Sequence, residues 1–253
     1  MVATLPAKQT TSIVYPSSDG EPLAESYAHL LVLIATLEVL RQYLEGQQAI
    51  VLANQFLYYA QGFPKMRVAP DVMVIYNVAP GGRDNYKVWE EGVVPSVIFE
   101  MTSQGTKNRD EGFKKDLYEQ MGVKEYWLFD PKGEWIEGQL QGYRLIKGEY
   151  EAIADGCSEI LKLQLRVEEN LIGFYRQDTG EKLLIPTELA QALKESRQEV
   201  QQERQERQQA QQEAQQAQQE AQQAQQAQQE AQQEAEKLAA KLRKLGIDPE
   251  EIT

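Results

Sequence analysis

The segment from residue 201 to residue 235 constrains this chain more than any other feature, because it contains only glutamine, alanine, glutamate and arginine. Nineteen of its 35 residues are glutamine, and neither glycine nor proline occurs. The eight alanines from position 210 to position 235 are separated by seven steps over 25 residues, a mean spacing between the coiled-coil repeat and that of a straight helix. We therefore predict a low-complexity helical or coiled-coil tail over residues 187–245, roughly 85 Å long.

Two interpretations of this tail are open. It is either a solvated helix without a specific partner, or a helix that forms a homo-oligomer through residues 188–245 along its alanines. Alanine buries little apolar area, so a seam of alanines is far weaker than a seam of leucines. Pro186 provides a breakpoint between the tail and the preceding domain.

Cysteine and histidine content excludes several kinds of site. The chain contains one cysteine, Cys157, and one histidine, His29. These numbers exclude a disulfide scaffold, a cysteine-based zinc site and a multi-histidine metal centre. No apolar run reaches the ~18 residues that a membrane helix requires, and the N-terminus lacks the apolar core of a signal peptide. We therefore expect a soluble, cytoplasmic protein without a membrane segment.

The formal net charge of −13 bears on possible partners. From Glu188 onward, 13 acidic and 8 basic residues give −5, which leaves −8 on residues 1–187. An acidic surface disfavours loose electrostatic binding to nucleic acids or to anionic membranes. Any activity on nucleic acid therefore requires divalent cations or a local basic groove.

Residues 13–175 show the succession of helical and strand patterns that is typical of an α/β domain. Helices are predicted at 25–45 and 109–120, strands at 49–60, 68–78, 95–102 and 125–129, and smaller strands near 135–137, 143–146 and 160–167. One helix precedes the strands, and another connects the third strand to the fourth. This order predicts an α/β fold with a mixed sheet flanked by helices.

Two acidic residues occupy positions where a core strand is expected to be apolar. Asp71 follows Pro70 near the start of one strand, and Glu100 lies where another strand ends. A buried carboxylate must be paired, protonated or bound to a metal ion. Two carboxylates on neighbouring strands supply the oxygen ligands that Mg²⁺ prefers. Their separation of 29 residues allows a strand–loop–strand geometry that brings them together.

Asp110, Lys114 and Tyr118 recur every four residues and therefore share one face of the predicted helix. In a generic helix this pattern indicates an ion pair with an aromatic neighbour. The helix begins shortly after the strand that carries Glu100, so Lys114 could instead reach the site beside that glutamate.

Taken together, these motifs resemble the Uma-two family of restriction-type endonucleases, within the PD-(D/E)XK nuclease superfamily. The resemblance covers roughly residues 13–175 and rests on Pro-Asp at 70–71, Glu-x-Thr-Ser at 100–103, Asp-x₃-Lys-x₃-Tyr at 110–118 and GVKEYWLFDP at 122–131. It implies a restriction-endonuclease-like core that hydrolyses phosphodiester bonds in DNA. Asp71 and Glu100 would hold Mg²⁺, or alternatively Mn²⁺, while a lysine assists the attacking water. By the same resemblance, Glu25 would complete the metal site through a water molecule.

The position of that lysine departs from the superfamily pattern, in which it stands two residues after the second acid. Here that position is Thr102, so the resemblance points to Lys114 on the following helix. Lys107, in a loop, and Lys115, about 100° away around the helix, are the alternatives. The displaced lysine also leaves a second function open, an inactive nuclease fold that serves as a scaffold or interaction module through its coiled-coil tail.

For other polar residues the sequence supports less specific predictions. His29 is expected to pack or to cap its helix, and Glu25 is alternatively an ordinary acid at a helix start. Arg83, Lys87 and residues 107–109 are candidates for phosphate contacts, because they are the basic loop residues near the predicted site.

Overall fold

A six-stranded mixed sheet organises the first part of the protein, as seen in a computed structural model that describes residues 13–20 and 26–244. The strands lie in the order β1-β4-β6-β7-β8-β9. They are β1 (Ala49–Ala53), β4 (Val72–Tyr76), β6 (Val97–Met101), β7 (Glu125–Phe129), β8 (Leu140–Ile146) and β9 (Glu149–Ile153). Strands β4, β6 and β7 are buried along almost their whole length, as expected for apolar strands that are covered on both faces.

Strands β6 and β7 run parallel, whereas the other neighbouring pairs of this sheet are antiparallel. A parallel pair requires a crossover connection. Here the crossover contains the π-helix η1 (Arg109–Lys114), which continues into the α-helix α3 (Lys115–Met121). Gly122 ends α3 in the left-handed conformation, with φ of 85°. The predicted α/β class, with a helix connecting the third and fourth long strands, is confirmed.

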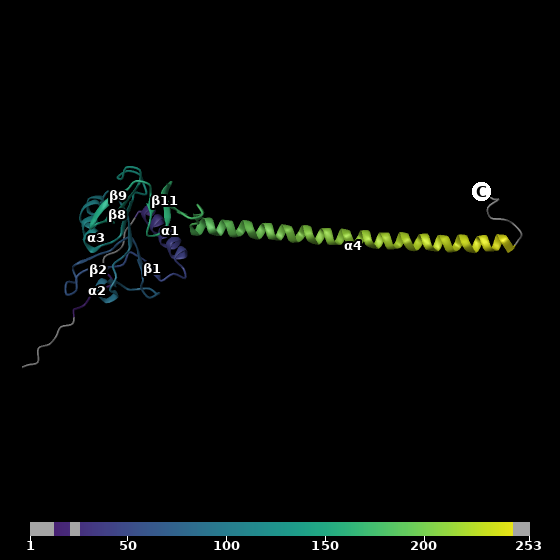
Figure 1. Cartoon of the computed structure of the whole chain (residues 1–253), viewed down its shortest axis with the longest axis horizontal. Coiled ribbons are helices and arrows are strands. Elements are labelled where there is room, and N and C mark those ends of the chain that lie inside the picture. The colour runs from purple at the N-terminus through teal and green to yellow at the C-terminus, as the bar shows by residue number, and fades with distance from the viewer. Residues whose placement is uncertain (1–12, 21–25, 245–253) are drawn as a thin grey trace, which may run out of the picture. The chain divides into compact units, whose positions relative to one another are not determined.

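One face of the sheet packs against helix α1 (Tyr27–Tyr43) and a second sheet (Figure 1). The strands of this second sheet are β10 (Cys157–Ser158), β11 (Leu163–Glu168), β12 (Leu171–Arg176) and β13 (Lys182–Leu183). The rings of Phe99 on β6 and Phe174 on β12 meet edge to face, with their centroids 6.0 Å apart. Aromatic contacts of this kind add to the apolar area buried between the layers.

The opposite face of the sheet packs against α3 and a three-stranded sheet in the order β3-β2-β5. The members of that sheet are β2 (Leu57–Tyr58), β3 (Arg67–Val68) and β5 (Tyr86–Lys87), and β5 leads into the short helix α2 (Val88–Glu91). Tyr118 of α3 and Tyr126 of β7 are fully buried, with ring centroids 5.2 Å apart. This contact holds α3 against the centre of the sheet.

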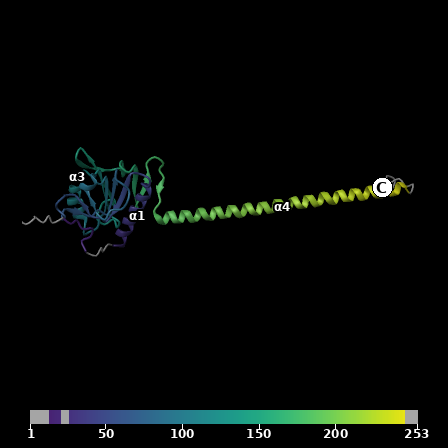
Figure 2. The same cartoon turned by 90° about the horizontal axis from the view of Figure 1, so that it is seen from below.

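Helix α4 extends from Pro186 to Lys244 over 59 residues (Figures 1 and 2). At 1.5 Å per residue it is about 88 Å long. The chain divides into two units between Leu189 and Ala190, and almost every described side chain of the second unit is exposed. The predicted long C-terminal helix is confirmed. Within the described ranges, no helix is sufficiently long and apolar to cross a membrane.

Three of the predicted strands differ from the structure. The strand predicted at 49–60 is divided because Asn54, in the left-handed region with φ of 49°, ends β1. The strand predicted at 68–78 is interrupted at Pro70, which has no N–H to donate to a neighbouring strand. Residues 135–137 form no strand, because the Asp130 carboxylate shapes a loop there. It accepts hydrogen bonds from the backbone N–H groups of Lys132, Gly133, Trp135 and Ile136.

Gly142 on β8 faces Trp127 on β7, and a Cβ atom at this glycine would lie 2.4 Å from the indole ring. Gly142→Ala is therefore expected to displace a buried tryptophan and to lower the free energy of unfolding by about 1–3 kcal/mol. Gly82→Ala is the matched control, because nothing lies within 4 Å of its Cβ position. Urea unfolding of both variants tests the prediction, and a Gly142→Ala protein as stable as wild type would contradict it.

Candidate active site

The two strand carboxylates are neighbours across the antiparallel pair β4–β6. The register places Val72 opposite Phe99, so Asp71 and Glu100 occupy the next facing positions. The Asp71 N–H donates to Glu100 Oε2 at 3.4 Å, and the Met101 N–H donates to Asp71 Oδ2 at 2.6 Å. Both carboxyl groups are buried. The structure thus brings together the two acids that the sequence separates by 29 residues.

Lys114 joins these carboxylates from the crossover. Its ammonium Nζ lies 2.7 Å from Glu100 Oε2 and 3.0 Å from Asp110 Oδ1. Asp110 and Lys114 both belong to the π-helix η1, a wider turn than an α-helix and one that occurs frequently at functional sites. Lys114 therefore points at Glu100, as the shared helix face predicts.

The alternative lysines point elsewhere. Lys115 Nζ lies over the ring of Tyr143, 3.8 Å from its centroid, and Lys107 Nζ donates to the carbonyl of Trp135 at 2.8 Å. Neither contact involves the strand carboxylates, so Lys114 is the lysine that the fold brings to them.

Hydroxyl groups hold the remaining carboxylate oxygens in place. Tyr118 donates from its hydroxyl to Glu100 Oε1 at 2.8 Å, and Lys114 contacts Oε2, so both oxygens of Glu100 have a donor. The Thr102 hydroxyl donates to Asp110 Oδ2 at 3.4 Å. Thr102, which occupies the usual lysine position, thus supports the residue that positions Lys114.

His29 also belongs to this cluster, although it had been expected only to pack or to cap its helix. Its Nε2 lies 3.3 Å from Asp71 Oδ1, and its backbone N–H donates to the Ser26 side chain that caps α1. The expectation that His29 caps its helix is wrong, because Ser26 is the cap and His29 only donates its backbone N–H to it, whereas the imidazole faces the candidate site. The only signal in the sequence was a histidine in the first turn of a helix, which by itself indicates no tertiary neighbour.

Burial determines which group of the cluster takes up a proton. It raises the pKa of Glu100 from 4.5 to about 8; the Lys114 ammonium opposes this rise, and Asp71 and Asp110 add to it. Burial acts to lower the pKa of Lys114, but the Glu100 and Asp110 carboxylates outweigh it, so the pKa is raised and the amine stays charged. Burial, reinforced by Glu100, keeps the pKa of Tyr118 well above its usual range, and Tyr118 remains a hydroxyl donor.

The donor set fits a hard divalent cation. Asp71 and Glu100 offer carboxylate oxygens from adjacent strands, and Mg²⁺ is commonly held by one or two carboxylates together with water and substrate phosphates. Among the residues that the structure describes, no group of three or more His, Cys, Asp or Glu side chains is placed to hold a metal ion. Glu25, predicted to complete the site through water, lies outside the described residues.

Strands β4, β6 and β7 and the crossover helix contain or border the motifs of a known family. The chain matches a family model described as "Uma2: Putative restriction endonuclease" over residues 4–172. The protein belongs to the Uma2 family. This membership confirms the resemblance drawn from the motifs and supports a nuclease function.

Comparison with other proteins adds one structural likeness for this Uma2 protein. It is similar to a solved structure from Anabaena variabilis described as "a putative nuclease belonging to DUF820". The two chains are 13% identical, with a TM-score of 0.40, and the match covers 66% of this chain and 86% of the other. A search of curated proteins gave no match.

Three basic residues of the Uma2 protein that were predicted to contact phosphates have acidic or carbonyl partners within the chain, whereas Arg109 lies over the ring of Phe113. Arg83 Nε lies 2.6 Å from a Glu91 oxygen, and Lys87 Nζ lies 3.1 Å from a Glu90 oxygen. Lys107 donates to a backbone carbonyl, as described above. A phosphate group would have to compete with these partners.

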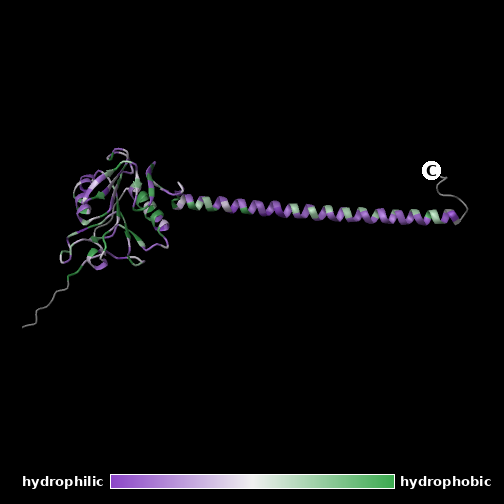
Figure 3. Cartoon of the chain, in the orientation of Figure 1, coloured by the Kyte–Doolittle hydropathy of each residue, from purple (hydrophilic) through white to green (hydrophobic). Residues whose placement is uncertain are grey.

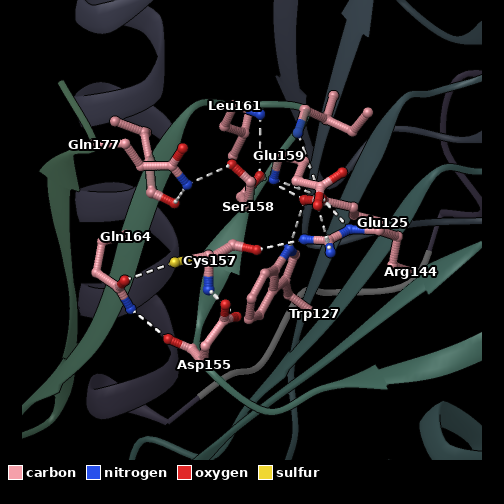
Figure 4. Close-up of polar contacts among 12 residues, drawn as sticks. Glu125, Trp127, Arg144, Asp155, Cys157, Ser158, Glu159, Leu161, Gln164 and Gln177 are labelled. Carbon is pink, nitrogen blue, oxygen red and sulfur yellow. Dashed lines mark hydrogen bonds and ion pairs between the residues drawn. The ribbon is translucent and has the colours of Figure 1, made fainter.

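A further buried carboxylate, Glu125, lies on the other face of β7 (Figure 4). It accepts hydrogen bonds from Arg144 Nε at 3.3 Å, from the Glu159 N–H at 2.8 Å, from the Trp127 indole at 3.3 Å and from the Ser158 hydroxyl. These donors come from β7, β8 and the β10 region, so Glu125 joins the two sheets. Its role is structural, since its oxygens are occupied by donors of the chain itself.

The raised pKa of Glu100 predicts a specific dependence of stability on pH in the metal-free protein. The folded state binds this proton more tightly than the unfolded state, so the contribution to stability is full below pH 4.5 and is lost as the pH rises towards 8. Glu100→Gln cannot ionise. We therefore expect the free energy of unfolding of Glu100→Gln to rise by about 1–3 kcal/mol relative to that of the wild type between pH 5 and pH 9.

Unfolding at a series of pH values in EDTA measures this difference. Glu137→Gln, at an exposed acid, is the control and should follow the wild-type curve. Parallel curves for wild type and Glu100→Gln would show that Glu100 ionises in the folded state as readily as in the unfolded chain.

Proposed function

We propose that this Uma2 protein is an endonuclease that hydrolyses phosphodiester bonds in DNA with the help of Mg²⁺, or of Mn²⁺ in its place. The observation that carries the proposal is the convergence of Lys114 with Asp71 and Glu100. Lys114, on the crossover, supplies the ammonium that Thr102 at the end of β6 cannot supply. Membership of the Uma2 family supports the same chemistry.

In this proposal Asp71 and Glu100 are the metal ligands. A bound divalent cation would supply Lewis-acid stabilisation and a more acidic water. The Met101 N–H keeps the Asp71 carboxylate oriented through Oδ2. With Glu100 as a metal ligand, the Lys114 ammonium would still be held by Asp110, and it would hold the attacking water and offset charge on the phosphate.

The alternative function is an inactive scaffold or interaction module that acts through the coiled-coil tail. The charge distribution favours it, because residues 1–187 carry a net charge of −8 and the basic residues Arg83 and Lys87 are already paired with glutamates. Divalent cations would offset the same charge for an active enzyme, and therefore a cleavage assay separates the two functions. The cytoplasmic location stays a prediction.

Lys114→Ala is expected to lower metal-dependent cleavage of supercoiled plasmid by a factor of about 10² or more, because it removes a positioned ammonium. Lys115→Ala is the matched control, since its side chain stacks on Tyr143, and it should keep most of the activity. Gel assays of nicked and linear product measure both rates. Equal rates for wild type and Lys114→Ala would refute the role of Lys114, and folded proteins that all fail to cleave would favour the scaffold.

Mg²⁺ or Mn²⁺ is expected to raise the melting temperature of the wild-type protein, because a ligand that binds only the folded state stabilises it. Asp71→Ala should lose this response, whereas Lys114→Ala should retain it, since an ammonium supplies no ligand. Thermal unfolding with and without each cation provides the measurement. The same shift in wild type and Asp71→Ala would place metal binding away from Asp71.

A further inference from the structure

Helix α4 carries a heptad pattern of which the alanines are only one part. With Leu189 at position d, the a and d positions from 189 to 238 hold leucine, valine or alanine at eleven of fifteen places. The exceptions are Ser196, Glu203, Arg207 and Gln228. Position f, on the opposite side, is glutamine at six of seven places from 198 to 240. An apolar stripe repeating every 3.5 residues is the pattern of a left-handed coiled coil.

The large apolar residues of this stripe are exposed. Leu193 is 51% exposed, Val200 46% and Leu238 62%. Figure 3 shows the same helix as predominantly hydrophilic with intermittent hydrophobic positions. Burial of these side chains against another helix would remove apolar area from water at both ends of the stripe.

Charges beside the stripe identify the partner and its direction. Position g is glutamate at 199, 206, 213, 220 and 234, whereas position e is arginine at 197 and 204 and then glutamine up to 232. In a parallel pair of helices, g contacts the e position of the partner five residues later, so Glu199 meets the partner's Arg204. In an antiparallel pair, the glutamates at g would face each other and repel.

Two polar core positions favour an in-register pair. Glu203 at d and Arg207 at a lie in consecutive layers. Without a shift, the two Glu203 side chains share one layer and the two Arg207 side chains share the next, so each glutamate can pair with the partner's arginine one layer away, and these two symmetric ion pairs offset the like-charge contacts within each layer. A shift by one heptad retains only one of them. Polar residues at core positions commonly specify register in this manner, at some loss of stability.

We propose that α4 binds a second copy of this chain as a parallel, in-register, two-stranded coiled coil. Because α4 begins at Pro186, directly after the globular domain, both domains would enter the coil at the same end. Resting on the proposed nuclease function, this arrangement tethers two active sites to one another at a high effective concentration, one for each strand of a duplex.

Oligomeric mass and orientation test the proposal on the full-length chain. Light scattering is expected to give twice the chain mass of 28.8 kDa. In a Cys157→Ser background, Ser196→Cys at position d should form an intermolecular disulfide on oxidation, whereas Gln198→Cys at position f should not. A monomer, a trimer or equal cross-linking at both positions would overturn the proposal.

A charge swap tests the direction of the helices independently of any cleavage assay. Glu199→Arg would face the partner's Arg204 and is expected to weaken dimerisation about tenfold. Addition of Arg204→Glu to the same chain should restore it. Gln205→Arg, at position f, is the control and should leave dimerisation unchanged. Tighter association of Glu199→Arg would indicate antiparallel helices and overturn the parallel arrangement.

Discussion

The candidate site depends on one buried ammonium that lies among three carboxylates. Lys114 contacts Glu100 and Asp110 directly, and Asp71 contacts Glu100 through its backbone N–H. Buried charges are stable only when they are paired and hydrogen-bonded. Removal of Lys114 would leave uncompensated negative charge in the core, whereas a divalent cation would supply positive charge at the same place. Burial raises the pKa of Glu100, with Asp71 and Asp110 adding to the rise, and the same group of carboxylates fits a divalent cation.

The crossover between two parallel strands places this ammonium beside Glu100. Strand β6 carries Glu100, and the connection to β7 must pass over one face of the sheet. Burial of Tyr118 and Tyr126 fixes the crossover helix on that face, and the Tyr126 hydroxyl donates to the carbonyl of Asp110 at 3.0 Å. Apolar packing thus positions a charged group that could not remain buried on its own.

The two units of the chain are stabilised by different interactions. The globular unit is held by apolar layers on both faces of the sheet and by hydrogen bonds to buried carboxylates such as Glu125. Helix α4 has almost no buried side chain within the chain. Its stability therefore depends on helix propensity, side-chain pairs one turn apart and, in our proposal, the second copy that covers its apolar stripe.

The sequence by itself determined the α/β class, the long helix and the shared helix face of Asp110, Lys114 and Tyr118. These features follow from local periodicity and motif order, which depend on neighbours along the chain. Only the tertiary structure decided that Lys114 rather than Lys107 or Lys115 reaches Glu100, that residues 135–137 form a loop around Asp130 and that His29 faces Asp71. The contacts of Lys114 and His29 join residues 14 and 42 positions apart, and the loop at 135–137 bends around a carboxylate five and six residues before it. Packing rather than local pattern selects such contacts.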